Sequence, residues 1–201
     1  MSALLKDLLS GMDTGTLKQL GQQAGIDSND ISGAVQAALP AILGGLTRNT
    51  GQAGGADALS NALRKDHDGS ALDNLGGLLQ NQDLLNQGQK ILGHVFGQKE
   101  ATVARGLGQA SNQSSDSMVK LMAMLAPVVM GMLGKKQQDE NLDSSSLAEM
   151  LGQEKQQYAK AQPQATDFLG SLLDADGDGD VDASDLLSKA PGLLNSLFGK
   201  G

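Results

Sequence analysis

The sequence predicts an all-α protein, a multi-helical bundle with an internal duplication. Three observations indicate this fold. The 201 residues include three Phe, one Tyr and no Trp, so a core must be built from Leu, Ala, Val, Ile and Met, which suits packed helices better than sheets. Apolar residues recur at helical spacing. A segment near the N-terminus is also similar to a second segment 87 residues further on.

The first copy of the duplicated segment is predicted to form three helices. A short helix ends near Gly11, a second covers about residues 16–24, and a third begins at a cap formed by Asp27 or Ser28 and continues through Pro40. The apolar residues of the third helix step by 4, 3, 4 and 4, as one helical stripe does: Ile31, Val35, Ala38, Ile42 and Leu46.

The segment between the two copies is predicted to connect them through loops and short helices. Residues 49–55 indicate a glycine-rich loop, residues 56–64 a short helix, and residues 65–70 a turn. Another helix is expected to follow, with its apolar face formed by Leu72, Leu75, Leu78 and Leu79.

The second copy repeats the pattern without gaps. Residues 20–22 (LGQ) align with 107–109 (LGQ), and Pro40 aligns with Pro127. The second apolar stripe steps by 4, 3, 4 and 3: Met118, Met122, Leu125, Val129 and Met132. Duplication explains these matches better than chance similarity of two leucine-rich stretches. Each long helix is expected to kink or break at its proline, and the Met stripe is expected in the core rather than in an adaptable binding groove.

Four segments in order resemble the YidB-like family of bacterial proteins, also called domain of unknown function 937. The segments are residues 39–46 (LPAILGGL), 65–74 (KDHDGSALDN), 91–97 (ILGHVFG) and 125–131 (LAPVVMG). The resemblance covers about residues 1–136. It implies an all-helical domain and no established enzymatic activity.

The composition changes after residue 136. Residues 146–149 match a capping box that would start a polar helix, which fades into a Gln/Lys/Ala linker at residues 153–164. We therefore expect a helical domain at residues 1–140, a polar helix and linker at 141–164, and a separate module with an apolar tail at 165–201.

The strongest motif in the chain is a twelve-residue acidic loop at residues 174–185 (DADGDGDVDASD). Carboxylates stand at positions 1, 3, 5, 7, 9 and 12, and Gly179 stands at position 6, where an EF-hand calcium loop turns sharply. The leucines at residues 169–173 and 186–187 are spaced like the inner faces of two flanking helices, so we expect a small EF-hand-like helix-loop-helix at the C-terminal end of the fold. The predicted metal ligands are Asp174, Asp176, Asp178, Asp180, Asp182 and Asp185. Position 12 is Asp rather than Glu, which should weaken the site or shift it toward Mg²⁺. The alternative is an acidic turn that binds no metal.

Charge and composition limit the classes of function. Residues 1–140 carry 11 Lys/Arg and 13 Asp/Glu, whereas residues 141–201 carry 4 and 10, so the acidity is concentrated around the loop. The absence of a basic patch argues against nucleic acid as a partner. There is no cysteine and no signal peptide pattern, and the most apolar stretch, residues 121–133, is too short to span a bilayer. We expect a cytoplasmic protein without a membrane span, although export by another route stays open.

The two histidines, His67 and His94, lack a spacing typical of metal ligands and are expected to cap helices or bond to carbonyl oxygens. No nucleophile elbow or phosphate-binding loop is present, so we expect no enzyme. Two hypotheses remain. The first is a calcium-binding structural or interaction protein, whose unpaired loop binds weakly alone or pairs two chains in a homo-oligomer. The second is a helix-turn-helix-like nucleic-acid-binding protein.

Overall fold

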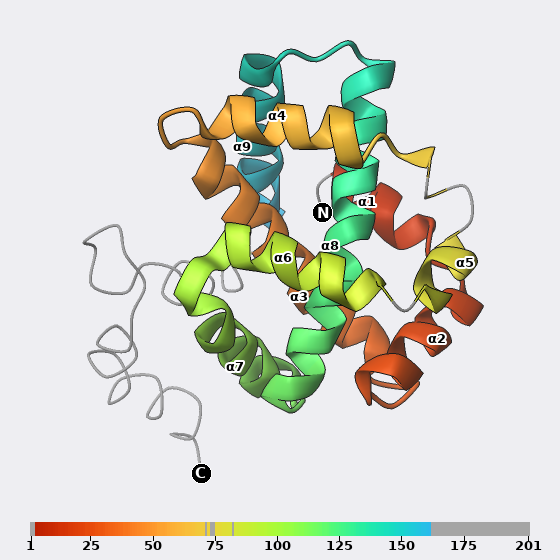
Figure 1. Ribbon diagram of the computed structural model, residues 1–201. Helices are drawn as coiled ribbons and strands as arrows, with labels where there is room; N and C mark the ends of the chain where they lie inside the picture. The colour runs from red at the N-terminus through yellow and green to blue at the C-terminus, as the bar shows by residue number, and fades with distance from the viewer. Residues whose placement is uncertain (1–2, 71, 73–74, 82, 162–201) are drawn as a thin grey trace, which may run out of the picture.

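The computed structural model of the protein describes residues 3–70, 72, 75–81 and 83–161 (Figure 1). These residues form helices and connecting turns with no strand, which confirms the all-α prediction for this part of the chain. The elements are α1 (Ala3–Ser10), α2 (Thr14–Ala24), α3 (Ile31–Thr50), α4 (Gly55–Asp66), α5 (Leu75–Gln80), α6 (Leu84–Phe96), the short 3₁₀ helix η2 (Gly97–Lys99), α7 (Glu100–Ser111), α8 (Ser115–Asp139) and α9 (Ser144–Ala161).

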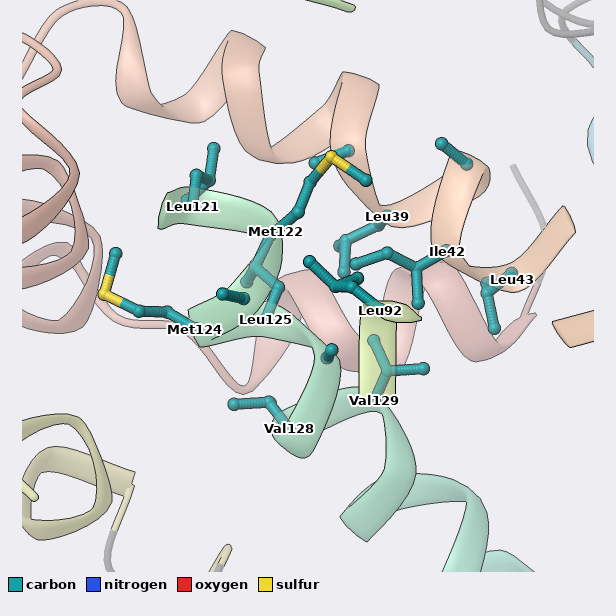
Figure 2. Close-up of a cluster of buried hydrophobic side chains, with 14 of the residues drawn as sticks. Leu39, Ile42, Leu43, Leu92, Leu121, Met122, Met124, Leu125, Val128 and Val129 are labelled. Atoms are coloured by element: carbon teal, nitrogen blue, oxygen red, sulfur yellow. The ribbon is translucent and has the colours of Figure 1, made fainter. Parts of the chain in front are cut away.

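Helix α8 forms the centre of the bundle. It packs against α2, α3, α4, α6 and α7, and Figure 1 shows it passing through the middle of the molecule. Its residues 121–126 are completely buried. Figure 2 shows side chains of α3, α6 and α8 meeting in one apolar cluster, to which they contribute Ile42, Leu92 and Val129, among others. The predicted apolar stripes therefore form the core.

Methionines of α8 help to fill this core. Met118 and Met122 are completely buried, and Figure 2 shows Met122 lying beside the residues of α3. Their flexible side chains occupy irregular gaps in a core that has few aromatic rings. This confirms the expected core position of Met118 and Met122, whereas Met132 of the same stripe is half-buried and Met130 lines the pocket described below.

The two prolines do not break the long helices. Pro40 lies within α3 and Pro127 within α8, and both helices continue on either side. Of the two expected outcomes, a kink or a break, the break is therefore wrong, and a kink at either proline stays a prediction. A proline removes one backbone hydrogen bond from a helix, but both flanks of these helices are buried, so apolar packing on each side holds the helix together across the proline.

Several helix ends differ from their predicted positions. Helix α2 begins at Thr14 because the Asp13 carboxylate accepts a hydrogen bond from the Thr16 N–H at 2.7 Å. Helix α3 begins at Ile31 rather than at residues 27–28, which belong to the preceding turn. Its C-terminus reaches Thr50, so the predicted loop at 49–55 shortens to residues 51–54.

Helix α9 starts earlier and runs further than expected. The Asp143 carboxylate accepts a hydrogen bond from the Ser146 N–H at 2.7 Å, so the helix begins before the predicted cap at residue 146. It continues to Ala161 instead of fading at 153, because Leu147 and Leu151 are completely buried where α9 packs against α3 and α4. The domain boundaries at residues 140 and 164 stay predictions.

A buried carboxylate ties α9 to the N-terminal helix. Glu154 is 8 % exposed, and its Oε2 accepts a hydrogen bond from the Leu4 N–H at 3.1 Å. This N–H lies in the first turn of α1, where backbone amides have no partner within the helix and a negative charge is favourable. Residues 141–161 thus contribute to the bundle.

Helices α2 and α7 end in the same way. Gly25 follows α2 with φ +73°, and Asn112 follows α7 with φ +55°, both in the left-handed region. In each case the next residue donates its N–H to a glycine carbonyl at 2.8 Å, Ile26 to Gly21 and Gln113 to Gly108. Each pair of corresponding residues is 87 positions apart.

One helix among the described residues, α8, is long and apolar enough to cross a membrane. The helix has 25 residues, so the shortness of the apolar stretch at residues 121–133 does not exclude a membrane span. Of its most apolar window, 78 % is buried inside the bundle, and the core helix of a globular domain meets the same criterion. The absence of a membrane span stays a prediction.

Candidate functional site: a pocket lined by both histidines

The predicted calcium ligands lie outside the described residues. They are Asp174, Asp176, Asp178, Asp180, Asp182 and Asp185, all within residues 162–201. The helices expected on either side of the loop lie in the same range.

Within the described residues, a pocket of about 590 Å³ lies where the end of α3, helix α4 and the second half of α6 meet. Its apolar lining includes Leu46, Ala58, Leu59, Ile91, Val95 and Met130. Its polar lining consists of Asn49, Gln52, Asp66, His67 and His94. A mostly apolar hollow of this size with a few polar groups is typical of sites that bind a small molecule or a short peptide.

Asn49 joins two walls of this pocket. From the last turn of α3, its Nδ2 donates hydrogen bonds to the carbonyl oxygens of His94 at 2.9 Å and Val95 at 3.4 Å. These carbonyls belong to the last turn of α6 and lack partners within the helix. One turn before Asn49, Gly45 leaves room for Val95 and Phe96, since a Cβ at that position would collide with both side chains. The sequence therefore brings the two helix ends together through a glycine and a capping amide.

His67 forms another wall at the end of α4. Its backbone N–H donates to the Leu63 carbonyl at 3.2 Å, and its imidazole is half-buried. A Cβ on Gly134 of α8 would collide with the His67 carbonyl oxygen, so this glycine permits the close approach. Burial lowers the pKa of His67, while the neighbouring Asp66 carboxylate opposes the shift. The imidazole is therefore neutral near pH 7, so one ring nitrogen is able to donate a hydrogen bond to a ligand and the other is able to accept one.

The structure brings both histidines to one pocket, which the sequence did not predict. His67 occupies the C-cap position of α4 through its backbone N–H, and His94 lies exposed in the last turn of α6. The expected capping or carbonyl bonding by the two imidazole rings stays a prediction. In the described part of the chain no group of three or more His, Asp or Glu side chains is close enough to hold a metal ion. The geometry thus favours a ligand held by apolar contacts and a few hydrogen bonds.

Sequence reasoning missed Asn49 and assigned its segment to a loop. The only sequence signal for this pocket was that each histidine lies within a segment that carries the family resemblance. Because contacts between α3 and α6 join residues about 45 positions apart, no local pattern reveals them.

These features define a helical bundle domain with a surface pocket. Residues 6–136 match the family described as bacterial proteins of unknown function, DUF937, and the chain belongs to this family. All residues that line the pocket fall within the match, whereas α9 and the acidic loop lie beyond it. No curated protein and no solved structure matches the chain.

Proposed function

We propose that this is a non-enzymatic structural or interaction protein that binds calcium through its acidic loop. The observation that carries the proposal is the ligand pattern of residues 174–185, in which every oxygen-bearing position of a calcium loop is an aspartate. Calcium takes six to eight oxygen ligands, and a loop of this kind supplies them from positions 1, 3, 5, 7, 9 and 12. The family domain contributes the pocket, and the loop contributes the metal site.

The individual ligands have different roles in this proposal. Asp174, Asp176 and Asp178 supply side-chain oxygens, Asp180 supplies its backbone carbonyl, and Asp182 binds directly or through water. Asp185 completes the coordination shell of the metal ion with a side chain that is one methylene shorter than the usual Glu. We therefore expect a weak site, with a Kd on the order of 10⁻⁴ to 10⁻³ M, and measurable binding of Mg²⁺.

The nucleic-acid alternative is less favourable. In a helix-turn-helix unit the second helix enters the major groove. In the units formed by α2 with α3 and by α7 with α8, the second helix is a core helix. Neither is free to enter a groove unless the bundle opens.

We further infer that the domain arose by duplication, with α1, α2 and α3 corresponding to α6, α7 and α8. Three observations support this. The helix ends after α2 and α7 match at an offset of 87 residues. Both third helices carry a proline inside. The cross-contacts are also reciprocal, because α2 packs against α8 and α7 packs against α3.

Calorimetric titration of the full chain with Ca²⁺ and with Mg²⁺ tests the proposal. The Asp174→Ala, Asp178→Ala variant should lose the heat of binding. The matched Asp27→Ala, Asp30→Ala variant, which removes two exposed carboxylates of the helical domain, should retain it. Sedimentation with and without metal reports on pairing of chains. If the wild-type chain and the loop variant titrate alike, the loop is an acidic turn and the proposal is wrong.

A further inference from the structure

We infer that the pocket between α3, α4 and α6 is a docking site for an apolar segment of the same chain, residues 192–198 (GLLNSLF). This inference does not rest on the proposed calcium site, because the segment begins beyond the last predicted ligand, Asp185. It connects two features that the proposed function leaves unused, the pocket and the apolar tail.

The pocket offers apolar surface that a peptide can reach. Ala58 is exposed and Ile91 is half-buried, and both line the hollow together with the more deeply buried Met130. Polar groups stand beside this surface, including the His67 imidazole and the Asn49 side chain. Such a surface fits a short helix or turn that presents a few large apolar side chains.

The segment has that pattern. Its large apolar residues are Leu193, Leu194, Leu197 and Phe198, at relative positions 1, 2, 5 and 6. Residues four apart share one face of a helix, so all four can point to the same side. Fully burying one Leu or Phe side chain contributes about 1.5–3 kcal/mol.

The chain is long enough to bring the segment to the pocket. Helix α9, the last described element, packs against α3 and α4, the helices that form much of the pocket. Residues 162–191 then provide 30 residues of tether, which spans roughly 100 Å when extended. A domain of this size has a radius of gyration of about 15 Å. Tethering raises the local concentration to on the order of 1 mM, so even weak contacts suffice.

Charge also favours this pairing. Residues 162–201 carry two Lys and seven Asp, a net charge of −5. The segments that line the pocket, residues 46–67 and 91–95, carry three Lys/Arg and two Asp, a net charge of +1 in a chain whose total is −8. Opposite net charges attract across distances of about 10 Å at ordinary ionic strength. The acidic part of the tail is thus drawn toward the side of the domain that holds the pocket.

The chain's two histidines both line the pocket, so their imidazole NMR signals report on it directly. We would compare the full chain with its Leu197→Asn, Phe198→Asn variant in EDTA, where metal plays no part. We expect both imidazole signals to shift. A control variant, Leu169→Asn, Leu172→Asn, makes the same change elsewhere in the tail and should leave them unchanged.

The reciprocal experiment fills the pocket. Ala58→Arg changes an exposed residue of α4, so the bundle should still fold. In protein labelled with ¹⁹F-phenylalanine, which has only three signals, we expect the Phe198 signal to move and the Phe168 signal to stay. Unchanged imidazole and Phe198 signals would overturn the inference, as would equal imidazole shifts in the control variant. Shifts that disappear on dilution would assign the pocket to the tail of a second copy instead.

Discussion

Gly88 allows a close contact between α6 and the central helix α8. A Cβ at this position would collide with the backbone carbonyl of Ala123. Ala123 is completely buried in the middle of α8, so this carbonyl moves only if the whole helix moves. We therefore expect Gly88→Ala to force the two helices apart.

The magnitude follows from two opposing effects. Replacing Gly by Ala in a helix stabilises it by about 1 kcal/mol through backbone entropy. Overpacking in a core typically costs about 1–3 kcal/mol and more where backbone is the obstacle. We expect the collision to win, so that Gly88→Ala lowers the free energy of unfolding by about 2 kcal/mol. For a chain of this length the melting temperature should fall by roughly 4–8 °C.

Gly93 provides a matched control on the same helix. It is exposed, and a Cβ there meets no atom within 4 Å. Gly93→Ala should therefore stabilise the protein, by up to about 1 kcal/mol. Urea unfolding followed by circular dichroism measures both variants. If Gly88→Ala is as stable as Gly93→Ala, the close packing of α6 on α8 described here is wrong.

Two further variants test the link between α1 and α9 and the burial of one histidine. Glu154→Ala removes the acceptor of the Leu4 N–H, so it should lower the free energy of unfolding by about 1–3 kcal/mol and speed amide hydrogen exchange in α1. The control Glu149→Ala removes an exposed carboxylate of the same helix and should change little. Equal exchange rates in the two variants would contradict the contact between Glu154 and Leu4. His67 has a pKa below its ordinary value of about 6.5 because of burial, so the unfolded chain binds more protons between the two values. The free energy of unfolding should therefore fall as the pH drops through 6.5 toward the folded pKa, and an unchanged slope in His67→Gln would exclude this residue as the cause.

The prediction of helices succeeded where the signal is local. The apolar stripes of residues 31–46 and 118–132 repeat with the period of a helix, and α3 and α8 are the helices that result. The same local reasoning could not decide between a kink and a break at Pro40 and Pro127, because the signal for either comes from the covalent geometry of the proline alone. Burial on both sides of the residue outweighs that signal, and burial is a property of the fold.

The sequence by itself determined the all-α class, the family membership and the acidic loop. Composition, periodicity and ligand spacing are properties of the linear sequence, so they can be recognised without the tertiary structure. Only the tertiary structure decided that α9 packs on the bundle and that His67 and His94 line one pocket. Those features depend on contacts such as Asn49 with the end of α6 and Gly134 with the end of α4. The partners in each contact are tens of residues apart, so helix packing brings them together and no sequence pattern encodes their distance.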